Sequence, residues 1–150
     1  MNKKVQIGVV GVDSGQLIIC DPCYIDDSWK EEEFVDYRRY RNINTKDELQ
    51  YLKHFRHYEE VIPNYNKTMN QLLDTKEWEE LPRPKPNNEF SYNGVCGKTL
   101  SKEGYGQIHY NFGNPGLAVA FSSGYGDGEY PVFAEINKDN RIVKITIEFD

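Results

Sequence analysis

The chain has 150 residues, which suits one domain built around a single core. Apolar residues make up 38% and charged residues 28% of it, and these globular values exclude wholesale disorder. The net charge of −6 disfavours extended nucleic acid and anionic membranes as partners, because Lys and Arg supply most of the affinity for phosphates. The 11 Tyr, 7 Phe and 2 Trp residues need a core, a stacking ligand or a protein partner.

The N-terminal segment carries two lysines but is too short and too broken for the core of an export signal. No apolar run reaches the roughly 18 residues of a membrane span, so we expect a cytoplasmic protein. The three cysteines do not suggest a disulfide framework in that compartment. Cys20 and Cys23 form a C-x-x-C pair, but no second pair at zinc-finger spacing accompanies it, so we expect neither a metal nor a cofactor.

Residues 5–25 have a β pattern. Apolar, β-branched residues fill 5–12, turn-forming residues follow at 13–15, and a second apolar run covers 16–20, which is typical of a hairpin. Asp21-Pro22 ends the second strand, because proline cannot donate to a strand ladder.

Residues 26–81 are predicted to form a helical insertion. Capping-box signatures begin at Ser28 and at Thr45, each with a glutamate three residues later. Behind the second signature, apolar residues recur at helical spacings of three and four, at Leu49, Leu52, Phe55, Tyr58 and Ile62. A third helix is predicted through Met69, Leu72, Leu73 and Trp78.

Three alternating prolines in residues 82–88 favour an extended strap. Strands are then predicted at 89–96, 106–112, 117–122, 129–136 and 141–149, with a tight turn at 137–140. The last strand alternates apolar and polar residues, which is typical of an antiparallel strand with one buried face. We therefore predict a single α+β domain, 1–150, in which an antiparallel sheet or partly open barrel carries the helical insertion.

A glycine-rich loop at residues 122–132 is the most distinctive local sequence. Its glycines permit a ligand to approach the backbone, Tyr125 and Tyr130 could stack on a planar ligand, and Asp127 could bind a hydroxyl or a cation. The alternative is a plain turn between strands.

The ends of the chain resemble a bacterial and phage family of domains of unknown function. The resemblance rests on the Ser-Gly-Tyr-Gly-Asp-Gly loop from Ser123, the following Tyr-Pro strand, and the acid-Phe ending at Phe149. It also includes the N-terminal Ser-Gly-Gln-Leu run from Ser14 and the strand that ends at Asp21-Pro22. The resemblance covers only the two ends and leaves 26–88 outside it. It implies a β-rich fold in which the termini come together, and it implies no activity.

A basic, tyrosine-containing cluster comprises Tyr37, Arg38, Arg39, Tyr40 and Arg41. Guanidinium groups bind phosphate and tyrosine rings stack on bases, so this cluster favours a small, anionic, nucleotide-like ligand. The alternative is that the arginines pair with the acidic residues just upstream.

We predict a non-enzymatic binding protein whose ligand contacts these five residues together with Asp21, Tyr125, Asp127 and Tyr130. A phage or prophage origin would make it an anti-defence sponge for a cyclic or ADP-ribose-derived signal. Open sheet edges and many tyrosines favour a homo-oligomer. One alternative is a protein inhibitor or toxin-immunity protein that acts through an acidic, Tyr-rich surface. Another is a small hydrolase or lyase that uses Asp21, Asp127 and His109.

Overall fold

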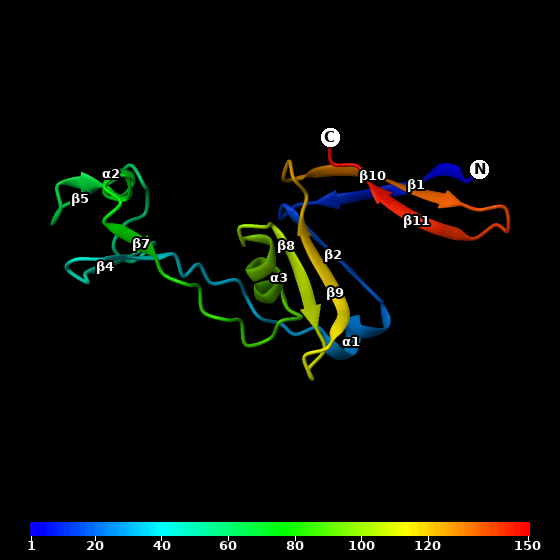
Figure 1. Cartoon of the computed structure of the whole chain (residues 1–150), viewed down its shortest axis with the longest axis horizontal. Coiled ribbons are helices and arrows are strands. Elements are labelled where there is room, and N and C mark those ends of the chain that lie inside the picture. Colours follow the sequence, from blue (N-terminus) through cyan, green and yellow to red (C-terminus); the bar gives the residue numbers. More distant parts are fainter. The chain divides into compact units, whose positions relative to one another are not determined.

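The structure is a computed structural model that describes all residues, Met1–Asp150. The chain divides into two compact units, one formed by Met1–Glu32 with Asn87–Asp150 and the other by Glu33–Pro86 (Figure 1). The second unit lies within the segment predicted as insertion and strap, and whether both units fold as one domain stays a prediction. None of the helices combines the length and the apolar character needed to cross a membrane.

The first unit contains two three-stranded antiparallel sheets. In one, β10 (Gly128–Ile136) lies between β1 (Lys3–Val12) and β11 (Ile142–Ile147). In the other, β9 (Pro115–Ser122) lies between β2 (Gln16–Cys20) and β8 (Tyr105–His109). The antiparallel strands predicted at 106–112, 117–122, 129–136 and 141–149 are thus confirmed, and the sheets form no closed barrel.

The predicted N-terminal hairpin is wrong, because β1 and β2 belong to different sheets. Both connections between the sheets, β1 to β2 and β9 to β10, bend at one corner. There the Ser123 amide donates to the Gly15 carbonyl at 2.9 Å. Gly15 has a φ of +67°, and a Cβ on it would lie 3.8 Å from Cα of Gly126. Turn residues at 13–15 therefore connect two sheets instead of closing a hairpin.

Two helices accompany the sheet β2-β9-β8. Helix α1 (Cys23–Ser28) follows β2, and α3 (Tyr92–Thr99) packs on β8 and β9. The strand predicted at 89–96 is therefore wrong. Ser91 begins α3 as its N-cap by accepting a hydrogen bond from the Gly94 amide at 2.9 Å. The core of this unit comprises Phe90, Val95, Ile108, Leu117, Ala118 and Ala120.

The second unit is mostly strand and turn, so a helical insertion is not clearly shown. A sheet joins β3 (Arg39–Asn42) to β4 (Glu48–Gln50) and β7 (Trp78–Glu80), and β5 (Val61–Ile62) pairs with β6 (Lys67–Thr68). The only helix is α2 (Met69–Asp74). The helices predicted behind Ser28 and Thr45 are wrong. Lys46 and Leu52 adopt positive φ angles of 66° and 65°, which a continuous right-handed helix excludes.

Candidate functional site

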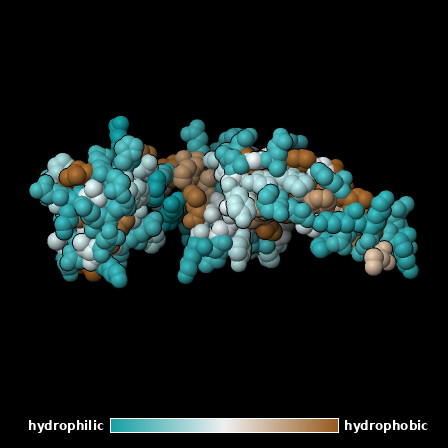
Figure 2. All heavy atoms as spheres, turned by 90° about the horizontal axis from the view of Figure 1, so that it is seen from above, coloured by the Kyte–Doolittle hydropathy of each residue, from teal (hydrophilic) through white to brown (hydrophobic).

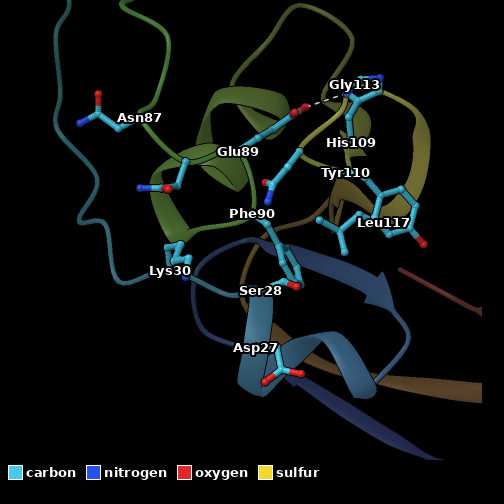
Figure 3. A pocket seen from close by; sticks show the side chains of 12 residues that line it. Asp27, Ser28, Lys30, Asn87, Glu89, Phe90, His109, Tyr110, Gly113 and Leu117 are labelled. Carbon is cyan, nitrogen blue, oxygen red and sulfur yellow. Dashed lines mark hydrogen bonds and ion pairs between the residues drawn. The ribbon is translucent and has the colours of Figure 1, made fainter.

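A cavity of about 500 Å³ opens in the first unit, between α1, the loop 87–90 and the turn that follows β8 (Figure 3). Its lining is largely polar. Ser28 and Lys30 lie on one side and Glu89 and His109 on another, and three asparagines, Asn87, Asn88 and Asn111, contribute amides.

The wall from α1 is held by contacts between Trp29, Lys30 and Phe90. The Lys30 amide donates to the Phe90 carbonyl at 3.0 Å. The Trp29 and Phe90 rings meet edge to face, with centroids 5.1 Å apart. These contacts fix the position of the Lys30 backbone at the cavity. The Lys30 ammonium group forms no ion pair within this unit.

The opposite wall is organised around the Glu89 carboxylate, which lies 2.9 Å from both the Lys98 ammonium and Nδ1 of His109 (Figure 3). Burial opposes ionisation of Glu89, but the hydrogen bond from His109 and the ion pair with Lys98 outweigh it, so its pKa lies below the ordinary value. A carboxylate only accepts hydrogen bonds, so the bonded Nδ1 carries the proton. With the proton on Nδ1, Nε2 can accept a hydrogen bond whenever the imidazole carries a single proton.

Tyr110 closes a third side. Its hydroxyl contacts the Tyr24 hydroxyl at 3.2 Å, and this contact raises the pKa of Tyr24 to about 12, so the Tyr24 phenol stays protonated at neutral pH. Gly116, with a φ of +129°, leaves room for the ring, since a Cβ there would approach Cε2 of Tyr110 to 3.0 Å. Gly116 therefore has two roles: it adopts a positive φ without strain, and it leaves space for the Tyr110 ring.

Glu32 fastens the loop 87–90 to the segment after α1. Its carboxylate accepts from the Asn88 amide at 3.2 Å and from the Asn93 side chain at 3.1 Å. Burial opposes its ionisation, but these hydrogen bonds prevail and hold its pKa below the ordinary value. Glu32 thus joins the points where the chain leaves and re-enters the first unit.

The glycine-rich loop forms the corner between the two sheets. Tyr130 is buried, its hydroxyl donates to the Gly126 carbonyl at 2.9 Å, and its ring meets Phe149 edge to face at 4.9 Å. Tyr125 is 81% exposed and Asp127 is also exposed. The internal bonds of this loop therefore support the fold, and Tyr125 and Asp127 are its two predicted site residues that a ligand can reach.

Asp21 and Asp127 lie at opposite ends of β2. Cys20 pairs with Ala118 and Gln16 with Ser122, which separates the two carboxylates by the length of the strand, roughly 16 Å. Asp21 accepts from the Cys23 amide at 3.0 Å, and this bond lowers its pKa. The structure does not bring Asp127 to Asp21, so the predicted acid pair does not converge.

Cys20, Cys23 and Cys96 are free thiols. The hydrogen bond between Cys23 and Asp21 raises the pKa of the Cys23 thiol, which disfavours the reactive thiolate. No group of three His, Cys, Asp or Glu side chains is placed to hold a metal ion.

Two of the three clustered arginines form ion pairs in the second unit. Arg38 donates to Asp36 through Nε at 3.0 Å and Nη2 at 2.7 Å, and its guanidinium lies over the Tyr51 ring at 3.8 Å. The hydrogen bonds to Asp36 raise its pKa. Arg41 pairs with Glu48 at 2.6 Å. Phosphate would have to compete with these carboxylates.

The other members of this cluster differ in accessibility. Tyr40 is buried, and its hydroxyl lies 2.7 Å from that of Tyr58. Tyr37 is exposed, and Arg39 forms no ion pair within this unit. All five residues of the cluster belong to the second unit and the other four predicted site residues to the first, so a common ligand for the two groups stays a prediction.

The sequence did not indicate the cavity. The capping signature at Ser28 places Lys30 in a predicted helix, and Asn87 and Asn88 end the predicted proline strap. Among the residues that line the cavity, only His109 is a predicted site residue, in the hydrolase or lyase alternative. No short motif joins these residues, because segments distant in sequence bring them together.

Comparison with protein families matches residues 6–147 to the family described as "Protein of unknown function (DUF4241)". The match includes the middle of the chain, so it extends beyond the two ends that carry the resemblance. Neither the curated proteins nor the solved structures contain a match. Because the family model spans nearly the whole sequence, the chain belongs to the DUF4241 family of proteins of unknown function.

Proposed function

We propose that the protein is a non-enzymatic binding protein for a small, nucleotide-like ligand, and that the cavity of the first unit is its binding site. The observation that carries this proposal is a cavity of about 500 Å³ that is lined by three asparagines and by Lys30, which forms no ion pair. Volumes of roughly 300–1,000 Å³ are typical of small-molecule sites.

The lining groups suit a nucleotide better than a purely apolar ligand. Each Asn amide offers both donors and an acceptor, the combination needed to bind the edges of a base or a ribose. Lys30 supplies a charge for a phosphate group. Glu89 does not repel an anion strongly, because the Lys98 ammonium at 2.9 Å balances its charge. Sequestration of a cyclic or ADP-ribose-derived signal is the more specific form of this proposal.

A thermal-shift screen against nucleosides, mononucleotides, cyclic nucleotides and ADP-ribose tests it. A ligand at one hundred times its Kd stabilises the folded protein by about 2.7 kcal/mol, which is readily measured as a rise in Tm. Lys30→Gln should remove most of the shift caused by a phosphorylated ligand, whereas Lys102→Gln, at an exposed loop position, should retain it. A screen without any shift, or a shift retained in Lys30→Gln, argues against the cavity.

A second function, general acid–base catalysis, is favoured by the Glu89–His109 pair. A carboxylate that orients an imidazole leaves Nε2 able to remove a proton from a bound molecule. Under this hypothesis, a ligand found in the screen is converted on prolonged incubation, and His109→Asn abolishes conversion while it still binds. Recovery of the ligand unchanged supports the binding function instead.

A further inference from the structure

We propose that Lys98, on helix α3, is a positioning residue that sets the charge of His109 in the cavity, through the Glu89 carboxylate that both side chains contact. This inference rests on the proposed function, because it states how the charge of the same binding site is regulated. Lys98 itself does not line the cavity, whereas Glu89 and His109 do.

Lys98 and His109 share one oxygen atom of Glu89. The Lys98 ammonium lies 2.9 Å from Oε1 of Glu89, and Nδ1 of His109 lies 2.9 Å from the same atom. The contact between Glu89 and His109 is drawn in Figure 3. A carboxylate without other partners would favour the doubly protonated, charged form of the imidazole. Because Lys98 places a positive charge at the same oxygen, Glu89 favours that form less strongly. Lys98 therefore keeps His109 uncharged down to a lower pH than Glu89 alone would allow.

No other charged group forms an ion pair with His109 or with Glu89. Strand β9, which pairs with β8, carries no ionisable side chain, and Lys98 is the only charged residue of α3. The other ionisable groups on β8, on α3 and in the turn after β8 are phenols and a thiol, which are ordinarily neutral at pH 7: Tyr92, Cys96, Tyr105 and Tyr110. On the α1 side of the cavity, Asp27 and Lys30 carry opposite charges. Glu89 and Lys98 are therefore the groups whose charges act most directly on His109.

Gly106 of β8 makes room for the Lys98 side chain. A Cβ on Gly106 would lie 2.7 Å from Cδ of Lys98 and 3.3 Å from its Cβ and Cγ, and the first distance is shorter than side-chain atoms tolerate. The lysine stem thus crosses β8 where the strand has no side chain. Lys98 also lies in the last turn of α3, which packs on β8. The glycine and the helix packing together direct the ammonium group to Glu89.

The three side chains are sheltered enough for their charges to interact. Hydrophilic residues cover most of the face seen in Figure 2, and water and salt screen charges at such a surface. The side chains of Lys98, Glu89 and His109 are only 31%, 32% and 37% exposed. Burial opposes ionisation of Glu89, yet the hydrogen bonds from His109 and Lys98 hold its pKa below the ordinary value. The carboxylate is thus ionised and acts on both partners.

The charge of His109 decides what the cavity can do. A singly protonated imidazole leaves Nε2 able to accept a proton, as general base catalysis requires. A doubly protonated imidazole instead adds a positive charge to that of Lys30, which favours a bound phosphate group. Lys98 favours the first state, and acidification favours the second.

An NMR titration of the three histidine rings in the full, ligand-free chain tests the proposal. Lys98→Met removes the charge and keeps most of the stem, so it should move the midpoint of the His109 titration to higher pH by at least about 0.5 units. Lys98→Arg keeps the charge and should retain the wild-type midpoint. Lys102→Met, at an exposed loop position, is the matched control and should also retain it. His54 and His57 lie in the second unit and serve as internal references.

A double-mutant cycle tests whether the effect passes through Glu89. Glu89→Gln alone should move the midpoint of the His109 titration to lower pH. Lys98→Met should then cause a smaller shift in the Glu89→Gln background than in the wild type, because the shared carboxylate is absent. Equal shifts in the two backgrounds overturn the proposal, and so does an unchanged His109 titration in Lys98→Met.

If the variants fail to fold, the wild-type protein decides. The carboxyl carbon resonance of Glu89 should shift over the pH range in which His109 titrates, and the absence of that shift overturns the proposal. These measurements use no ligand. A confirmed role of Lys98 beside an empty thermal-shift screen would reject the binding function alone, whereas a bound ligand beside an unchanged titration would reject the role of Lys98 alone.

Discussion

Glu89 connects the cavity to the stability of the first unit. Its carboxylate binds Lys98 and His109, while its backbone carbonyl lies beneath Gly94 of α3. One residue thus fixes the imidazole at the cavity and supports the start of the helix. The ionised form of its side chain is the one that these contacts favour, which is why its pKa is lowered.

Glu89→Gln should therefore lower stability in a pH-dependent way. A carboxyl group whose pKa is lower in the folded than in the unfolded state stabilises the protein above its unfolded pKa, near the ordinary value of 4.5. That contribution disappears as pH falls through the folded pKa. The difference in Tm between wild type and variant should be largest near pH 7 and shrink below about pH 4.

Glu103→Gln is the control for this measurement, since Glu103 is exposed and forms no ion pair. Thermal unfolding at pH values from 3 to 7 should show little difference between this control and wild type. A Tm difference for Glu89→Gln that does not change with pH would contradict the role assigned to its charge.

At the scale of elements, α3 depends on a glycine that the sequence alone does not distinguish. Gly94 and Gly97 lie in the same helix. A Cβ on Gly94 would collide with the backbone of Glu89 and would lie 2.7 Å from the Asn88 carbonyl oxygen, whereas a Cβ on Gly97 would meet nothing within 4 Å. Only the packed structure separates a required glycine from a replaceable one.

Gly94→Ala should destabilise the protein by about 2 kcal/mol or more, because backbone atoms cannot yield as a flexible side chain would. Gly97→Ala should instead be neutral or stabilise it by up to about 1 kcal/mol through helix propensity. Urea unfolding monitored by circular dichroism compares the two. Equal effects would show that α3 does not pack on the loop as described.

The sequence predicted core membership in the middle segment better than it predicted secondary structure. Leu49, Phe55 and Ile62 were expected on one helical face, and all three are buried in the core of the second unit. Their spacing fits a helix, but it also fits short strands joined by turns, and burial by itself does not distinguish them. The capping box that does form, Thr68 with Gln71, directly precedes the apolar run of α2.

The C-terminal strands were predictable because alternation and turn residues act locally. Asn137 accepts hydrogen bonds from the amides of Asp139 and Arg141, and Asn140 takes a positive φ of 61°, so the turn is encoded where it occurs. The cavity was not predictable in this way. Lys30 and Asn88 come from two loops and His109 from the end of β8, and their convergence depends on the pairing of β8 with β9 and on the contacts of Glu32.

For the whole molecule, each unit has its own core. The apolar cluster around Phe55 and Met69 lies entirely within residues 33–86, and that around Ile108 lies entirely outside them. The first unit consists of two segments of the chain, Met1–Glu32 and Asn87–Asp150. A hydrogen bond joins these segments near the break between them, since the Asn93 amide donates to the Glu32 carbonyl at 3.1 Å.

Replacing residues 33–86 by a short Gly-Ser linker should therefore leave the first unit folded, with a cooperative thermal transition and an intact cavity. Differential scanning calorimetry of the shortened chain checks this expectation. A broad transition without a heat-absorption peak would mean that the first unit needs the second in order to fold.

The binding function of the cavity is tested most directly by NMR titration of the labelled full chain with a ligand from the thermal-shift screen. The account predicts shifts of the backbone amides of Ser28, Lys30, Asn88 and His109, which surround the cavity. Shifts confined to Arg38, Arg39 and Arg41 would place the ligand on the basic cluster and contradict the account, and so would the absence of any shift.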